Sequence, residues 1–191
     1  MSNGYDEARN QRNVLERLVD KIPGFRGFQD RELRRDVDKM QREHLAADLG
    51  RIKNDLRERA RGYTDAGKIA ALGGFDRLDR QIDGLSQAIR FSDYGASGFF
   101  DPVKIGDAEL QRLYQFDLSV IEDLNGLEQE IATIPAPGAD DSAPALERVL
   151  QRVRALGDKW RQRELVISNV VQNGGTLETP DAPGTSGAPG A

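Results

Sequence analysis

Asp117 is the residue of this 191-residue chain whose position most suggests chemistry. It lies in the segment LQRLYQFDLSVIEDL, where apolar residues recur at heptad spacing and Asp117 takes one of the apolar positions. A carboxylate removed from water without a partner costs several kcal/mol, so we expect Asp117 to have one. The candidate partners are arginines and tyrosines: Arg77, Arg80, Tyr63 and Tyr94. The alternative role, a lone general acid or base, is less favoured because such sites normally assemble several groups.

His44 is the only histidine of the chain. It falls on the apolar stripe of a predicted helix, and no pair of acidic residues stands around it at the Glu-x-x-His spacing of a helix-bundle metal site. Because histidine is intermediate in burial, we expect a semi-buried packing residue with a structural role.

Two further patterns approach known ligand-binding motifs without completing them. Residues 62–69, GYTDAGKI, have the glycines and lysine of a phosphate-binding loop, but Ile69 stands where Ser or Thr should bind magnesium. Asp76, Asp79 and Asp83 share one helical face that could attract a cation, yet the loop and final glutamate of a calcium hand are missing. We therefore predict no catalytic, cofactor-binding or metal-binding residue, and no cofactor.

The composition limits the kind of protein this is. There is no cysteine, which excludes disulfides, thiolate nucleophiles and cysteine-based zinc sites. A hydrophobic fraction of 38% with 31% charged residues fits helices that each carry one apolar stripe. The N-terminus lacks the basic start and apolar run of a signal peptide, and no window approaches the length of a membrane-spanning segment. We expect a cytoplasmic protein.

Apolar residues that recur every three or four positions predict the elements that position these side chains. Helices are expected over residues 6–21, about 29–60, 75–90 and 107–131, and again from Pro144 after a connector at 134–145. Residues 62–74 should carry only a short turn of helix. The fourth helix has the heptad rhythm of a coiled coil. The sequence thus predicts an all-α fold, an antiparallel bundle of four to five helices.

The second predicted helix has an apolar stripe that changes side near His44. Such a change means either that the helix meets different partners along its length or that it bends or breaks. Gly50 is a plausible weak point because glycine is a poor helix former.

We expect one domain over residues 1–173, followed by a disordered tail over 174–191 that is too rich in Gly and Pro to support a core. A tight turn, IPGF, begins at Ile22. The rings of Phe25 and Phe28 either cover the end of the bundle or, together with Arg26, form an exposed docking knob.

A second aromatic segment, FSDYGASGFFDPVKI at residues 91–105, is expected to be an ordered loop. Its Phe99 and Phe100 would then pack against the bundle.

The segments IPGFRGF with ELRRDVDKMQREHLA, FDRLDRQID with IRFSDYGASGFFDPVKI, and LYQFDLSVIEDL resemble a family of small, uncharacterised helical proteins of bacterial genomes. The resemblance covers most of residues 14–131, and the turn followed by the Arg-Arg helix is its most distinctive part. It implies a bacterial, non-secreted protein and an ordered loop at 91–105. It implies no activity, because the family has no established function.

Three classes of function follow. The first is a non-catalytic helical protein that binds another protein or itself, with contacts expected at Phe25, Arg26, Phe28, Arg34, Arg35, Phe99 and Phe100. The second is a peripheral binder of nucleic acid or anionic membrane through the basic N-terminal helices, at Arg26, Arg31, Arg34, Arg35, Lys39 and Arg42. Acidic residues interleave with these cations, which is more typical of a solvated helix face. The third is an enzyme that uses Asp117 with a basic partner.

Overall fold

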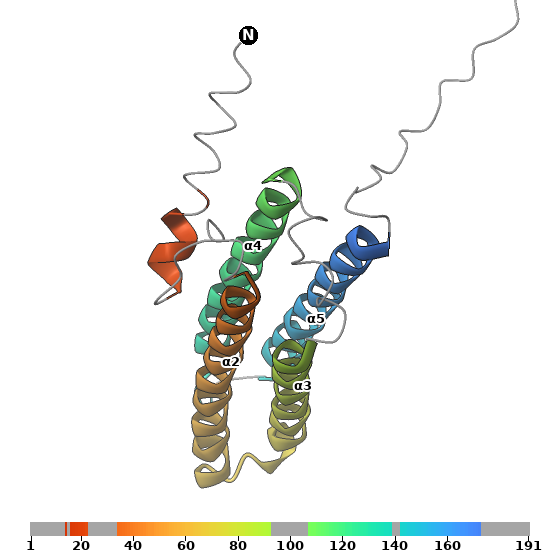
Figure 1. The fold of residues 1–191 in the computed structure, drawn as a ribbon. Coiled ribbons are helices and arrows are strands. Elements are labelled where there is room, and N and C mark those ends of the chain that lie inside the picture. The colour runs from red at the N-terminus through yellow and green to blue at the C-terminus, as the bar shows by residue number, and fades with distance from the viewer. Residues whose placement is uncertain (1–13, 15, 23–33, 93–106, 139–141, 173–191) are drawn as a thin grey trace, which may run out of the picture.

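Four long helices form the body of the protein, whose computed structural model describes residues 14, 16–22, 34–92, 107–138 and 142–172. They are α2 (Arg34–Asp65), α3 (Leu72–Phe91), α4 (Asp107–Ala132) and α5 (Ala143–Gln172) (Figure 1). Residues 14 and 16–21 add a short N-terminal helix, and η2 (Ile69–Ala71) is a single 3₁₀ turn. The predicted all-α bundle is confirmed.

Successive helices run in opposite directions, so α2 pairs with α3 and α4 pairs with α5 as two helical hairpins (Figure 1). Between the hairpins, α3 packs against α5 and α2 packs against α4. Helices α3 and α5 run parallel, because each is the second helix of its hairpin. Helices α2 and α4 also run parallel, because each is the first.

A single apolar core fills the space between the helices. From α3 it takes side chains spaced three and four residues apart: Phe75, Leu78, Ile82, Leu85 and Ile89. From α4 it takes the predicted heptad row, which is buried from Leu113 to Ile131, and a second row through Leu118 and Ile121. Two buried rows fit the position of α4, which lies against both α2 and α5.

The end of the bundle near the α2–α3 turn is held by two side chains of α2. The hydroxyl of Tyr63 donates to the carbonyl of Pro135 at 2.6 Å, and its ring lies 5.0 Å from that of Phe75. The guanidinium of Arg59 donates to the carbonyls of Ala132 and Ile134 at 3.1 and 3.2 Å. A cation on the last carbonyls of α4 is favourable because those groups have no partner within the helix.

The helix α2 ends later than predicted, and of the two alternatives left open for it, the structure shows no break. It runs unbroken through Gly50 and ends at Asp65, five residues beyond the predicted end. Its buried row also does not change side near His44: the row of Leu45, Leu49, Ile52 and Leu56 continues toward the N-terminus as Arg42 and Asp38. Met40 and His44, on the other predicted stripe, are only partly buried. From Asp38 onward, where the side chains are described, the change is therefore in residue type and not in the face that is buried.

The turn between α2 and α3 is also shorter than predicted. Residues 62–65 belong to α2 and α3 begins at Leu72, so the segment expected as mostly non-helical is reduced to residues 66–71. Gly67 adopts φ +71° there. Residues 62–69, the loop that approaches a phosphate-binding motif, are therefore half helix.

Several predicted features lie outside the described residues. These are the tail at 174–191 and the side chains of Phe25, Arg26, Phe28, Arg31, Tyr94, Phe99 and Phe100, together with the side chains of Arg34 and Arg35.

Two glycine-to-alanine changes test these backbone assignments. At both Gly50 and Gly67 an added Cβ would meet nothing within 4 Å, so sterics are equal and only the backbone differs. We expect Gly50→Ala to raise the free energy of unfolding by about 0.5–1 kcal/mol, because glycine is that much less favourable inside a helix. Gly67→Ala should lower it by about 1 kcal/mol, because φ is positive there. Thermal unfolding followed by circular dichroism measures both, and two shifts of the same sign would contradict the assignment.

Candidate functional site

Asp117 lies in a group of four buried charged side chains, here called the ionic cluster. Asp38 and Arg42 come from α2, Asp117 from α4 and Arg163 from α5, and each is 0–4% exposed. Two anions and two cations balance, which is the condition under which buried charges are tolerated.

Arg163 is the residue that joins the helices in the cluster. Its Nε donates to Oδ1 of Asp117 at 2.6 Å and its Nη2 to Oδ2 of the same carboxylate at 3.3 Å. The same Nη2 donates to Oδ1 of Asp38 at 2.7 Å. A guanidinium can do this because its donors are arranged in a planar fork that matches carboxylate oxygens.

Arg42 connects the cluster to α3, the remaining long helix. Its Nε donates to Oδ2 of Asp38 at 2.9 Å, an i,i+4 pair on one face of α2. Its Nη1 donates to the main-chain carbonyl of Arg90, in the last turn of α3, at 2.9 Å. All four long helices are thus connected by charge-assisted hydrogen bonds, which are about twice as strong as neutral ones.

The protonation of the central pair follows from burial and from the opposite charges. Burial raises the pKa of the Asp117 carboxyl, and Arg163 opposes this by favouring the ionised form. For Arg163, burial alone would lower the pKa, but Asp117 and Asp38 outweigh it and the net direction is upward. Arg163 is therefore a permanent cation, and burial opposes the charged form of both Arg163 and Asp117.

Two polar side chains beside the cluster have hydrogen-bonding atoms without a partner. Gln41, 0% exposed, lies near enough to Asp117 to favour its ionised form, but neither atom of its amide meets hydrogen-bond geometry. Trp160, 1% exposed, has an unpartnered Nε1. The Trp160 ring also carries the guanidinium of Arg163 4.8 Å from its centroid, within the range of a cation–π contact.

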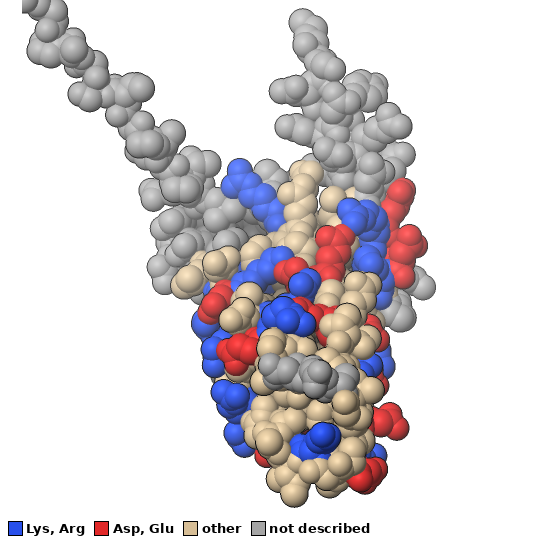
Figure 2. All heavy atoms as spheres, turned by 180° about the vertical axis from the view of Figure 1, so that it is seen from behind, with Lys and Arg blue, Asp and Glu red and all other residues tan. Residues whose placement is uncertain are grey.

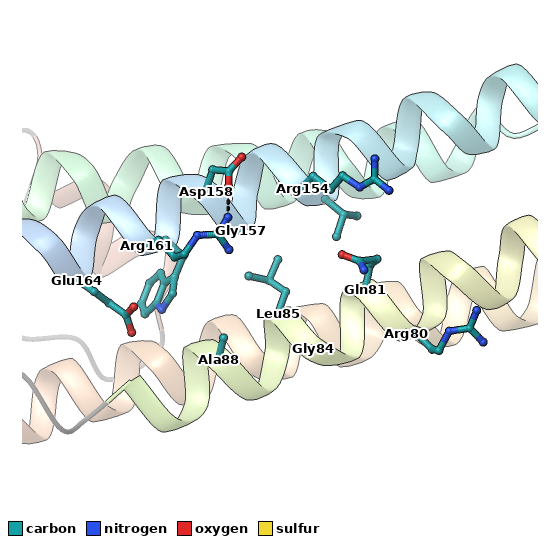
Figure 3. A pocket seen from close by; sticks show the side chains of 12 residues that line it. Arg80, Gln81, Gly84, Leu85, Ala88, Arg154, Gly157, Asp158, Arg161 and Glu164 are labelled. Carbon is teal, nitrogen blue, oxygen red and sulfur yellow. Dashed lines mark hydrogen bonds and ion pairs between the residues drawn. The ribbon is translucent and has the colours of Figure 1, made fainter.

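Trp160 connects the ionic cluster to a surface groove of about 390 Å³, here called the α3–α5 groove (Figure 3). Leu85, Val153 and Trp160 contribute to its apolar lining. Arg80 of α3 and Arg154 of α5 lie toward one end, and Glu164 lies toward the other (Figure 3). Burial raises the pKa of Glu164, while Arg163 and Arg161 act in the opposite direction.

The structure gives Asp117 a different partner from those that the sequence suggested. Arg77 is exposed, Arg80 lines the groove and Tyr63 bonds to Pro135, whereas Arg163 binds Asp117. Arg163 was missed although it carries the same signal as Asp117. It continues the heptad row of α5, which runs Val149, Val153, Leu156, Trp160, Arg163. A charged residue at an apolar position of a second helix is the natural partner of the first.

Two other residues singled out in the sequence, His44 and Arg42, differ in burial. His44 has a side chain 20% exposed, with Nε2 3.5 Å from a carboxylate oxygen of Asp48. Arg42, a proposed surface contact for nucleic acid or membrane, is buried in the ionic cluster, so that expectation was wrong for this residue.

The acidic face of α3 pairs with α2. Arg57 donates to Asp79 at 2.5 and 3.1 Å, and this hydrogen bonding is the main reason why the pKa of Asp79 lies below its usual value. Lys53 donates to Asp83 at 2.5 Å. Within the described ranges no three His, Asp or Glu side chains are gathered as a metal site.

Comparisons with protein-family models, with curated proteins and with solved structures gave no match to this chain. In the part of the chain that the structure describes, no helix has both the length and the apolar character needed to cross a membrane.

Replacing Arg163 with methionine tests how much the ionic cluster depends on it. Asp38 and Asp117 would remain buried with Arg42 as the one cation of the cluster. We expect the free energy of unfolding at pH 7, measured by urea denaturation, to fall by about 3–5 kcal/mol. The matched control is Arg148→Met on the same helix, where the arginine is exposed. It should change the free energy by about 0.5 kcal/mol or less.

The loss in free energy of unfolding caused by Arg163→Met should depend on pH. Without the guanidinium, the pKa of Asp117 is raised further above its unfolded value, so the folded variant binds protons more tightly than the unfolded chain. Its stability relative to the parent protein should therefore recover as pH falls from 7 toward the usual pKa of aspartate, about 4. Urea denaturation across this range measures the recovery. A deficit that stays constant with pH would show that lost packing, and not unpaired charge, causes it.

Proposed function

We propose that this chain is a non-catalytic helical protein that acts by binding another protein or a second copy of itself. In this proposal the ionic cluster fixes the positions of the helices, and the exposed surface of α3 and α5 makes the contact.

The observation that carries the proposal is the state of Asp117. Both of its carboxylate oxygens accept hydrogen bonds from Arg163, and the residue is 0% exposed. A general acid or base must come within about 3 Å of the proton that it transfers, directly or through one water. A carboxylate enclosed by the core and by a permanent cation is better suited to holding helices together, which supports a structural role over the enzyme hypothesis.

The groove between α3 and α5 supports a binding role. Arg80 and Arg154 are exposed, and neither forms an ion pair or hydrogen bond within the described part of the chain. They stand beside an apolar lining that includes the indole with an unpartnered donor. By contrast, the large exposed apolar side chains of the described residues each come from a different element, and such single residues are normal on a surface. They are Val19, Ile69, Phe91 and Leu165.

The proposal is tested by light scattering after size-exclusion chromatography, together with affinity purification from a bacterial lysate. We expect either a species heavier than the 21.1 kDa monomer or a partner that is recovered repeatedly in a fixed ratio to the chain. Purification without bait provides the background. A monomer that retains nothing above this background would contradict the proposal.

A further inference from the structure

We propose that the α3–α5 groove binds an amphipathic helix of a partner protein that presents acidic side chains to Arg80 and Arg154. This inference rests on the proposed function and names the contact surface and the chemistry of the partner.

Charge is the first reason for this assignment. Five charged residues line the groove: Arg80, Arg154, Arg161, Asp158 and Glu164. Arg161 is paired with Asp158, as the dashed line in Figure 3 shows, so their charges are satisfied within the protein. Glu164 lies at the end of the groove away from Arg80 and Arg154, so its carboxylate is separated from their guanidinium groups (Figure 3). At the end of the groove where Arg80 and Arg154 lie, the charge left for a ligand is therefore positive, and it favours carboxylates.

The size of the groove is the second reason. Its lining runs from Arg80 to Ala88 on α3 and from Val153 to Glu164 on α5. At about 1.5 Å per residue this is a length of roughly 12–17 Å, or two to three turns of a bound helix. A volume of about 390 Å³ holds roughly three side chains of leucine size, taking about 30 Å³ for each non-hydrogen group as for water. Three apolar anchors over two turns are what an amphipathic helix presents to a groove.

The lining of the groove supplies a third reason. On the α5 wall, Trp160 is 1% exposed and forms part of the closed apolar lining. On the opposite wall, a Cβ at Gly84 would meet nothing within 4 Å, so this position is open for an incoming side chain.

A second groove, between α2 and α3, differs in how many of its cations are already paired. It has a volume of about 440 Å³ and is lined by Arg51, Lys53 and Arg57, among others. These three cations already pair with Asp48, Asp83 and Asp79. Arg90 is the fourth cation of the lining, so within the described residues this groove keeps one cation without an ion pair, against two in the α3–α5 groove. This groove contains Gly50 and therefore supplies a control position for the first.

The test begins with a library of random 12-residue peptides displayed on phage and selected against the full chain. We expect the enriched peptides to have apolar residues three or four positions apart together with Asp or Glu. Synthetic copies are then titrated against the chain while tryptophan emission is recorded. Trp160 is the only tryptophan and lines the groove, so peptides made without tryptophan report on binding there.

Two variants should weaken binding while keeping the fold. Gly84→Leu fills the groove, and because its Cβ is unobstructed and leucine is a good helix former, thermal unfolding should show no loss of stability. Arg80→Glu combined with Arg154→Glu reverses the free charge. Each should raise the Kd at least about tenfold, equivalent to about 1.4 kcal/mol.

Matched controls carry the same changes elsewhere: Gly50→Leu in the second groove, and Arg77→Glu with Arg148→Glu at exposed positions. These should leave the Kd within about twofold, because surface charges away from the contact contribute little.

Three results would overturn the inference: no enrichment of peptides, enrichment without acidic residues, or equal binding by the Gly84→Leu variant.

A blue or red shift of Trp160 emission in Glu178→Lys with Asp181→Lys, without added peptide, would assign the groove to this chain's own C-terminal segment instead. The lysate purification separates failure of this inference from failure of the proposed function. A partner captured equally by the parent chain and by Gly84→Leu would keep the binding function and remove the groove from it.

Discussion

The structure depends on one constraint: the guanidinium of Arg163 is buried and cannot lose its charge. Removing such a cation from water costs several kcal/mol, which is recovered only if carboxylates meet it in good geometry. Asp117 does so from α4 and Asp38 from α2. Arg42 then links Asp38 to the main-chain carbonyl of Arg90 on α3. The position of each long helix is therefore fixed, at this level of the bundle, by hydrogen bonds with defined donors and acceptors.

This constraint complements what the apolar core provides. Rows of Leu, Ile and Val stabilise the bundle in proportion to buried area, but similar rows can also pack after a helix slides by one turn. A slide of α5 would separate Arg163 from Asp117 and leave both charges buried and unpaired, at a cost of about 3–5 kcal/mol. The ionic cluster therefore contributes less to total stability than to the choice of one helix register, while the core supplies the stability itself.

How far the sequence could predict this arrangement depended on the type of signal. The apolar spacing predicted the helices and the all-α fold, and Asp117 stood out because it interrupts an apolar row. Asp38, Arg42 and Arg163 interrupt such rows equally. The alternating charges around Asp38 and Arg42 are typical of a solvated face, which hides the signal of these two residues. Which of these charged residues meet could not be predicted, because heptad spacing does not say that α2 and α5 both lie beside α4. Gly50, a plausible weak point from the sequence, does not break α2, since packing along the helix outweighs a propensity cost of about 1 kcal/mol.

Trp160 links the interior constraint to the surface. One of its contacts is the guanidinium of Arg163 in the ionic cluster, and the same side chain lines the α3–α5 groove. Because Arg163 is held by two carboxylates, the indole packed beneath it has little freedom to change rotamer. The groove consequently has a preformed lining, which lowers the entropy lost when a partner binds. The side chains that would supply charge to the partner, Arg80 and Arg154, are by contrast exposed and have no ion pair with the described residues, so they can adjust to it. A rigid apolar lining with adjustable charges at one end is the physical basis on which we assign binding to this face.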